Sequence, residues 1–175
     1  MRNRLMALAL LFGATPAHAE VVAASDTSLT VRTTVTVTAS IATAWSTLEA
    51  PAVWWPSDYT YSRRPGELSL SPRAGGCLCE RLINNGSAEI MHVLLRQPGQ
   101  RLRLSGMPRP LDQKLGYGLL DVTFQERIAD RKKLIDVTFE FRAFGQSGMG
   151  QMAGHVDMLF AEAALHYQNY ANTRR

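Results

Sequence analysis

The amino-acid sequence predicts an α+β domain in which about seven antiparallel strands form a curved sheet around one long C-terminal helix. Apolar residues alternate with polar ones in short segments between residues 30 and 141, which is the period of half-buried strands. After the glycines at positions 145, 148 and 150 the apolar spacing changes to three and four, the period of a helix. The 175 residues, 46% of them hydrophobic and 19% charged, suit one globular domain and exclude a disordered or disulfide-dense chain.

The first strand and two short helices are predicted from residues 30 to 56. Valines alternate with threonine and arginine from Thr30 onward, so this segment is predicted as a strand with one buried face. Ser40 is a suitable N-cap for a short helix over residues 41–48, where apolar side chains recur every three or four positions. Pro51 ends that helix and can open a second short helical turn before the next proline.

The middle of the chain is predicted to be a run of strands and hairpins, followed by the long helix. The predicted strands cover residues 67–71, 77–83, 88–96, 101–105, 120–124 and 135–141. The sequence Asn84-Asn85-Gly86-Ser87 is a tight-turn signal, and residues 129–131 form the turn of a second hairpin. The helix over residues 152–170 is the element long and amphipathic enough to cover the apolar face of the sheet.

Residues 1–19 have the features of a cleavable signal peptide. Arg2 and Arg4 precede an apolar run, and Ala17-His18-Ala19 is a small-x-small pattern, so we expect cleavage before Glu20. The protein is therefore expected to be periplasmic or secreted, with a retained N-terminal anchor as the alternative. No later segment is long and apolar enough to be a predicted membrane span.

The remainder divides into a short lead-in and one domain. Residues 20–29 lack periodicity and are expected to be flexible, which leaves residues 30–172 as the folded domain. The formal net charge of +4 includes two leader arginines, so the exported chain is weakly charged and gives no indication of nucleic-acid binding.

Several local sequences together carry a resemblance to a known family. They are Ala44-Trp45-Ser46-Thr47-Leu48, Trp54-Trp55, Ser71-Pro72-Arg73-Ala74-Gly75-Gly76-Cys77-Leu78-Cys79-Glu80, Pro98-Gly99-Gln100-Arg101-Leu102-Arg103-Leu104 and Val156-Asp157-Met158-Leu159. With the order of strands and helices, they make the chain from Thr30 to Tyr170 resemble the START-like, or SRPBCC, helix-grip superfamily of lipid-transfer domains, polyketide cyclases and a chaperone-activator domain. The resemblance implies a pocket between the long helix and the sheet, in members that range from carriers to enzymes. The export signal and the Cys-x-Cys sequence depart from the superfamily pattern.

A pocket in that place would be apolar, because the inward residues of the sheet and the helix are Val, Leu, Phe and Met. We therefore predict binding of a small hydrophobic molecule, lipid-like or aromatic, without a cofactor or a metal. The expected lining residues are Trp54, Trp55, Leu78, Glu80, His92, Leu94, Phe124, Phe139, Met152, Val156 and Leu159. A filled core would give the same pattern. The alternative functions are an enzyme of the cyclase or dehydratase kind and a protein-interaction module, whose protein partner the sequence does not identify.

Glu80 and His92 form the candidate acid/base pair of the enzyme alternative. A three-residue loop over residues 85–87 places them opposite one another on the pocket face of one hairpin. The carboxylate would then hold the imidazole tautomer and make the imidazole a stronger base. A two-residue loop instead places Cys79 beside His92 and turns Glu80 to the other face. A cross-strand hydrogen bond that fixes the sheet is the structural alternative.

Cys77 and Cys79 point the same way from their strand, and three states are open for them. Two reduced and packed thiols, a disulfide between positions i and i+2, and a metal or redox site that includes His92 all suit the spacing. Export favours oxidation, while a zinc site lacks a fourth ligand. Trp45, in the first short helix, is expected to lie in the core.

Overall fold

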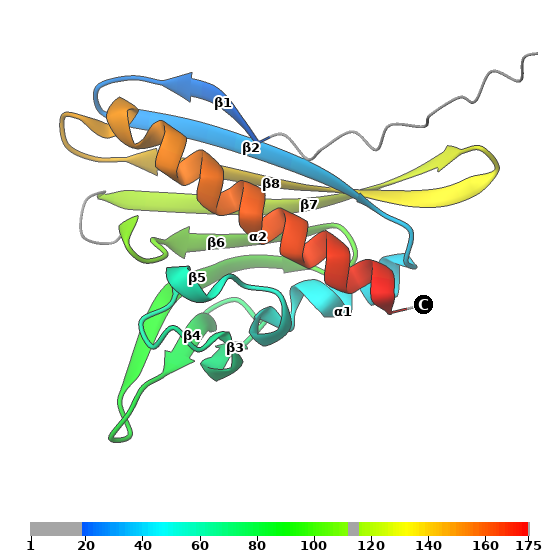
Figure 1. The fold of residues 1–175 in the computed structure, drawn as a ribbon, viewed down its shortest axis with the longest axis horizontal. Coiled ribbons are helices and arrows are strands. Elements are labelled where there is room, and N and C mark those ends of the chain that lie inside the picture. The colour runs from blue at the N-terminus through cyan, green and yellow to red at the C-terminus, as the bar shows by residue number, and fades with distance from the viewer. Residues whose placement is uncertain (1–18, 112–115, 175) are drawn as a thin grey trace, which may run out of the picture.

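The computed structural model describes residues 19–111 and 116–174, in which one antiparallel sheet is covered on one face by a long helix (Figure 1). The eight strands follow the order β1-β2-β8-β7-β6-β5-β4-β3 across the sheet. They are β1 (Ala19–Ala24), β2 (Ser28–Val37), β3 (Leu68–Leu70), β4 (Cys77–Arg81), β5 (Ser87–Gln97), β6 (Arg101–Gly106), β7 (Tyr117–Ala129) and β8 (Lys132–Phe144). The helices are α1 (Ile41–Leu48) and α2 (Ala153–Thr173), with 3-10 turns η1 (Pro51–Val53), η2 (Ser57–Tyr59), η3 (Pro65–Glu67) and η5 (Met149–Met152). The predicted helix-grip architecture is confirmed.

Strand β1 occupies the segment that we expected to be a flexible lead-in, and that expectation is wrong. β1 pairs antiparallel with β2, with Val21 opposite Val31, and it is one edge of the sheet. Val21 and Val22 are each more than 40% exposed, so the strand is held by backbone pairing rather than by a buried face that alternation could reveal. This edge strand raises the strand count above the seven expected. Residues 1–18 of the expected signal peptide lie outside the described residues.

The alternation in β2 and the cap of α1 are as predicted. Val31, Val35 and Val37 are buried on the face toward α2. Ser40 caps α1, because its hydroxyl oxygen accepts a hydrogen bond from the backbone N–H of Thr43 at 3.1 Å. Helix α1 lies next to the C-terminal half of α2 (Figure 1).

Helix α2 packs mainly on β2 and joins the sheet to α1. The ring of Phe160 on α2 stacks on Phe141 of β8, with 4.7 Å between the ring centroids. The buried hydroxyl of Tyr167 donates a hydrogen bond to the Ala44 carbonyl at 2.8 Å, and burial raises the pKa of this tyrosine. No helix in the described part of the chain is long and apolar enough to cross a bilayer.

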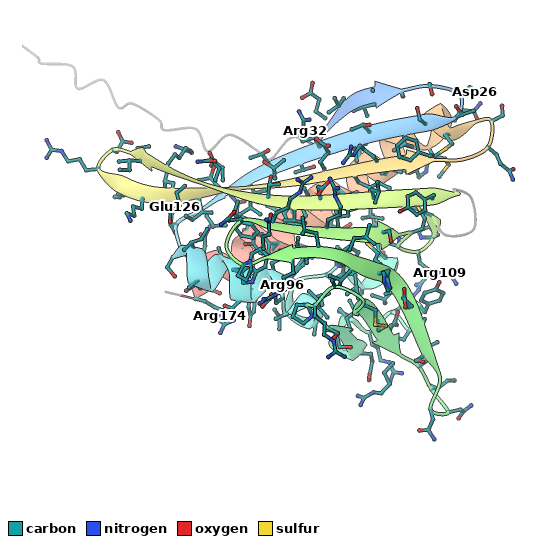
Figure 2. The ribbon with its side chains drawn as sticks, turned by 180° about the vertical axis from the view of Figure 1, so that it is seen from behind. Asp26, Arg32, Arg96, Arg109, Glu126 and Arg174 are labelled. Atoms are coloured by element: carbon teal, nitrogen blue, oxygen red, sulfur yellow. A yellow bond between two sulfur atoms is a disulfide. The ribbon has the colours of Figure 1, made fainter. Side chains whose placement is uncertain are left out.

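The opposite face of the sheet is polar and is open to solvent (Figure 2). Asp121 on β7 is buried on this face among three arginine side chains. Arg101, Arg103 and Arg142 each donate a hydrogen bond to its carboxylate, over distances of 2.7 to 2.9 Å. Burial alone would raise the pKa of Asp121, but the hydrogen bonds and charges of Arg103 and Arg101 outweigh it and lower the pKa to about 2.

Candidate functional site

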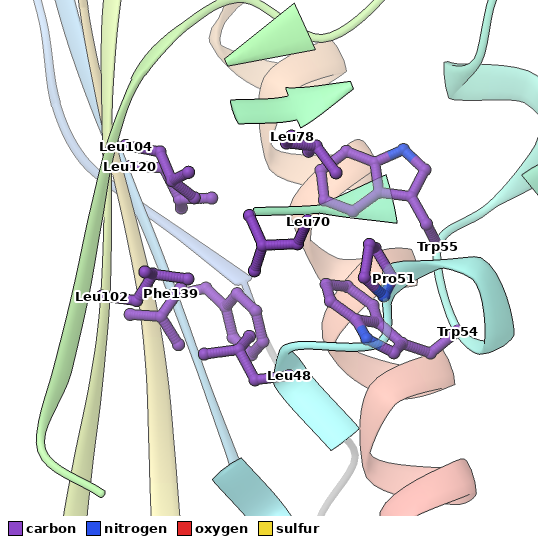
Figure 3. Close-up of a pocket in the computed structure, with 11 residues that line it drawn as sticks. Leu48, Pro51, Trp54, Trp55, Leu70, Leu78, Leu102, Leu104, Leu120 and Phe139 are labelled. Atoms are coloured by element: carbon purple, nitrogen blue, oxygen red, sulfur yellow. The ribbon is translucent and has the colours of Figure 1, made fainter. Parts of the chain in front are cut away.

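A small apolar cavity lies between the sheet and the turns that follow α1 (Figure 3). Its volume is about 20 Å³. One wall is the inner face of β6, β7 and β8, and the other is the end of α1, the turn η1 and strands β3 and β4. The lining residues are Leu48, Pro51, Trp54, Trp55, Leu70, Leu78, Leu102, Leu104, Leu120, Val122 and Phe139. The cavity is apolar, as predicted, but no residue of α2 lines it, so it lies between the sheet and the turns after α1 and not between the sheet and the long helix.

The cavity offers a ligand no hydrogen bond from its two tryptophans. The indole N–H of Trp54 donates to the Thr47 carbonyl at 2.8 Å, and that of Trp55 donates to the Tyr59 carbonyl at 3.3 Å. A water needs roughly 10–15 Å³ and two to four polar partners. The space could hold about one water but lacks the partners, so its chemistry favours an apolar occupant. A molecule with even one aromatic ring requires the walls to separate.

The two walls differ in how firmly they are held. The sheet wall belongs to a continuous ladder of backbone hydrogen bonds through β6, β7 and β8. The turn wall consists of three-residue 3-10 turns and the three-residue strand β3 at the sheet edge. Fewer backbone hydrogen bonds between strands thus hold the segment of residues 51–70 than hold the sheet wall.

Trp54 and Trp55 form a buried aromatic wall of the cavity. Both are at most 5% exposed, and their ring centroids lie 5.4 Å apart. Trp54 also makes edge contacts with Tyr167 at 5.6 Å and with Phe139 at 6.1 Å. These contacts connect the turn wall to both α2 and the sheet.

Glu80 and His92 do not meet, and the predicted acid/base pair is wrong. Cys77, not Glu80, is the cross-strand partner of His92, while Glu80 lies opposite Ala88. Arg81 pairs with Ser87, so the hairpin loop covers residues 82–86 and is longer than either expected loop. Asn84 and Asn85 both adopt positive φ, 56° and 60°, which centres the turn one residue earlier than Asn85-Gly86. A register shift between Leu78 and Cys79 moves the partners further.

Glu80 instead anchors the turn wall. Its side chain is buried, and its two carboxylate oxygens accept hydrogen bonds from the backbone N–H groups of Tyr61 at 2.7 Å and Ser62 at 2.6 Å. Carboxylates that accept two backbone donors make strong charge-assisted bonds. Glu80 therefore holds in place the segment that follows η2 in the chain, and it does not line the cavity.

The other predicted lining residues are divided among several places. Leu78 and Phe139 line the cavity together with the two tryptophans, as predicted. Phe124 packs on Trp45 with 5.3 Å between ring centroids, and Val156 is a fully buried residue of α2. The remaining predicted residues lie apart from the cavity. Met152 and Leu159 border a separate hollow of about 110 Å³ near the start of α2. Leu94 is 43% exposed on the polar face of the sheet. The side chain of His92 is also 43% exposed and lies beside Glu89.

Most of the cavity lining was missed by sequence reasoning, although its signal was present. Leu70, Leu102, Leu104 and Leu120 occupy the inward positions of strands that were predicted by alternation. Their place around one cavity depends on the strand order, because β3 and β6 are separated in the sheet by two other strands. A one-dimensional pattern identifies the buried face but not which buried residues surround a gap.

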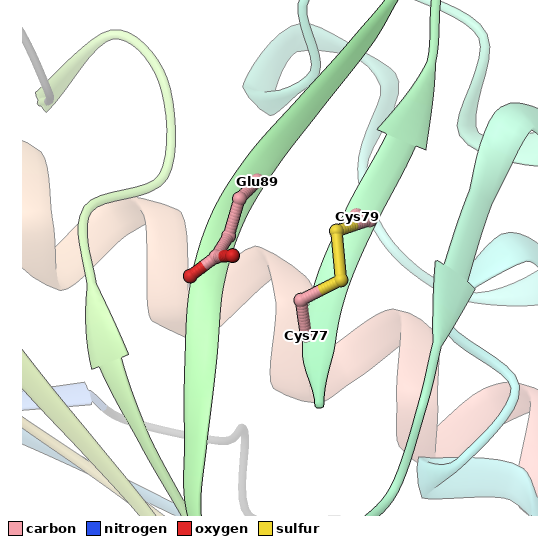
Figure 4. Close-up of side chains that lie close together, drawn as sticks. All are labelled: Cys77, Cys79 and Glu89. Atoms are coloured by element: carbon pink, nitrogen blue, oxygen red, sulfur yellow. A yellow bond between two sulfur atoms is a disulfide. The ribbon is translucent and has the colours of Figure 1, made fainter. Parts of the chain in front are cut away.

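Cys77 and Cys79 form a disulfide, which decides between the three states left open by their spacing. The bridge lies on the face of β4 away from the cavity, beside Glu89 of β5 (Figure 4). Both sulfur atoms and a carboxylate oxygen of Glu89 lie within 4.8 Å of one another, which is a separation that suits metal ligands. With the sulfurs bonded to each other, the cluster has no thiolate to offer a metal in this state.

Comparison with known proteins supports the fold and leaves the activity open. No protein-family model matches the chain, and no curated protein matches it. Among solved structures, CalU16 from Micromonospora echinospora is 14% identical with a TM-score of 0.50, over 87% of this chain and 80% of that chain. DynU16, a protein of the dynemicin biosynthetic locus, is 15% identical with a TM-score of 0.55, over 86% of this chain and 48% of that chain.

A third solved structure shares the fold. The Aha1 dimer from Colwellia psychrerythraea is 14% identical with a TM-score of 0.51, over 82% of this chain and 97% of that chain. At these identities the likeness is one of fold alone. The chain therefore shares with these structures a helix-grip fold, in which an antiparallel sheet is covered by a long C-terminal helix.

Proposed function

We propose that this protein binds a small apolar molecule, lipid-like or aromatic, between the sheet and the chain of residues 48–78. The observation that supports the proposal is the cavity itself, whose lining is apolar on every side and whose two walls differ in rigidity. The cavity of about 20 Å³ must widen to admit such a molecule, and the proposal has the turn wall move outward as the ligand enters.

Burial of the ligand surface supplies the affinity. An aromatic molecule that buries about 200 Å² of its surface gains roughly 5 kcal/mol at about 25 cal/mol per Å². Displacement of the turn wall, with the loss of contacts around Trp54, subtracts from that gain. A gain of 5 kcal/mol alone corresponds to a dissociation constant of about 0.2 mM, so we expect values on the order of 1 mM for single rings and tighter binding for larger ligands.

Binding is favoured over catalysis because the cavity lining lacks a titratable side chain among its residues. Glu80 is occupied by backbone donors, and His92 lies on the other face of the sheet. Proton transfer at a bound substrate needs a group within hydrogen-bond reach. A cyclase or dehydratase role would thus require residues that do not surround this cavity.

A fluorescence titration with N-phenyl-1-naphthylamine, a neutral apolar dye, tests the proposal. Leu104→Trp adds a large side chain inside the cavity and is expected to weaken dye binding at least tenfold. Leu94→Trp adds the same side chain to the neighbouring strand on the exposed face, and it is the matched control with unchanged binding. Leu70→Ala enlarges the cavity and is expected to tighten dye binding.

The outcomes separate the possible functions. Weaker binding in Leu104→Trp, together with wild-type binding in Leu94→Trp, supports the cavity as the ligand site. Equal binding in all three variants, or a dye that binds none of them, contradicts the proposal and favours a protein-interaction role for a filled core. Circular dichroism of each variant shows whether the fold is retained.

We also propose that the protein acts outside the cytoplasm after removal of residues 1–19. The expected cleavage point, before Glu20, lies one residue after the start of β1, so a mature chain would lose the pairing of Ala19 with Thr33 and keep that of Glu20 with Arg32. Mass spectrometry of the exported chain should give an N-terminus at Glu20. A chain that retains its leader in the membrane fraction would overturn this proposal.

A further inference from the structure

The disulfide between Cys77 and Cys79 lies on the solvent side of the sheet and is accessible from outside. Leu78 and Glu80 of the same strand are buried, so the alternation of β4 directs both cysteines to the polar face, where each is half-buried. The view in Figure 4 shows the two sulfur atoms on that side of β4, next to β5. A thiol in solution can therefore approach this bridge, whereas a disulfide within the core would be shielded.

The residues opposite the bridge on β5 are both ionisable, and they differ for the two cysteines. His92 is the cross-strand partner of Cys77, and Glu89 is the partner of Cys79. The Nδ1 atom of His92 lies 3.2 Å from a carboxylate oxygen of Glu89, so the carboxylate orients the ring. The Glu89 carboxylate lies within 4.8 Å of both sulfur atoms, but only Cys77 has an imidazole opposite it, so a thiolate at Cys77 has a neighbour that can donate a hydrogen bond.

A stabilising role explains this disulfide poorly. The entropy that a bridge removes from the unfolded chain grows with the number of residues in the loop, and this loop encloses the single residue Leu78. The pairing of β4 with both β3 and β5 already fixes the positions of Cys77 and Cys79. Reduction would leave the two thiols close together on one face of the strand, ready to form the bridge again.

We propose that Cys77 and Cys79 form a thiol–disulfide exchange site whose partner is a reduced dithiol. A thiolate of the partner attacks Sγ of Cys79, a new S–S bond forms there, and the bond electrons leave on Sγ of Cys77, beside His92. The second thiolate of the partner then attacks the partner's own sulfur in that mixed disulfide and releases Cys79. The partner becomes a disulfide, and Cys77 and Cys79 accept two electrons and, from water, two protons.

Dithiothreitol, used as the dithiol with native protein, tests the proposal. Samples are quenched over time with a maleimide-linked polyethylene glycol, and the shift for two modified cysteines is followed by gel electrophoresis. We expect reduction without denaturant, at least fivefold slower reduction in His92→Gln, and faster reduction in Glu89→Gln. His155→Gln removes an exposed histidine on α2 and is the matched control, with an unchanged rate.

Single-cysteine variants test the assigned direction. In Cys79→Ser the thiol of Cys77 is expected to ionise at a lower pH than the thiol of Cys79 does in Cys77→Ser, as followed by thiolate absorbance at 240 nm. His92→Gln should remove that difference. A bridge that is reduced only in urea, or rates within twofold of one another for wild type, His92→Gln and Glu89→Gln, would overturn the proposal. Neither outcome affects the apolar cavity, since the bridge lies on the opposite face of β4.

Discussion

Replacement of Asp121 by asparagine should destabilise the protein by an amount that depends on pH. Asp121 is 5% exposed at its side chain and accepts hydrogen bonds from three arginines. Its pKa falls from 3.8 to about 2 in the folded state, and such a shift corresponds to roughly 2 kcal/mol of folding free energy. Because the pKa is lower in the folded chain, this stability is present above about pH 4 and is lost as the pH falls toward 2.

Urea unfolding followed by circular dichroism measures the effect. At pH 6 Asp121→Asn should unfold with a free energy about 2 kcal/mol below that of wild type, and the gap should narrow steadily between pH 4 and pH 2.5. Glu140→Gln, in the more exposed ion pair with Arg32, is the matched control and should cost less than about 1 kcal/mol. A gap of the same size at every pH would refute the reasoning.

Four further substitutions test individual contacts of the fold. Glu80→Gln weakens the hydrogen bonds that hold the turn wall and should lower the free energy of unfolding in urea by about 1–3 kcal/mol. His92→Ala should change it by less than about 0.5 kcal/mol. A larger loss for His92→Ala than for Glu80→Gln would indicate a structural role for His92. Tyr167→Phe leaves the Ala44 carbonyl without its donor and should lower the unfolding free energy by about 1–2 kcal/mol, and a neutral result would contradict the bond. Ser40→Ala removes the cap of α1 and should cost about 1 kcal/mol, measured by the same assay.

The fold was predictable because the apolar residues of each buried strand or helix recur with the period of that type of element. The valines of β2 alternate, and the apolar residues of α2 recur at three and four, so each element identifies its buried face without knowledge of its neighbours. Strand β1 could not be predicted in this way, since an exposed edge strand has no buried face. β1 pairs with the edge of β2 that β8 leaves free, and β2 presents that edge only after it has joined the sheet.

The apolar character of the candidate site was predictable, but its place beside the turns after α1 and most of its residues were not. The Glu80–His92 pair depended on a hairpin register, and one residue of shift is enough to turn a side chain to the other face. The structure has both a longer loop and a register shift beside Cys79, which no count of positions from the turn can reveal. The hydrogen bonds that Glu80 accepts from the backbone N–H groups of Tyr61 and Ser62 join segments about twenty residues apart, so no local sequence pattern indicates them.

The most direct test of apolar binding between the sheet and the turn wall is methyl NMR of leucine-labelled protein during titration with N-phenyl-1-naphthylamine. Binding in the cavity should shift the methyl signals of Leu70, Leu78 and Leu104, which line it, while those of the exposed Leu94 and Leu165 stay in place. Shifts confined to the exposed leucines, with the cavity leucines unmoved at saturating dye, would contradict the proposed site.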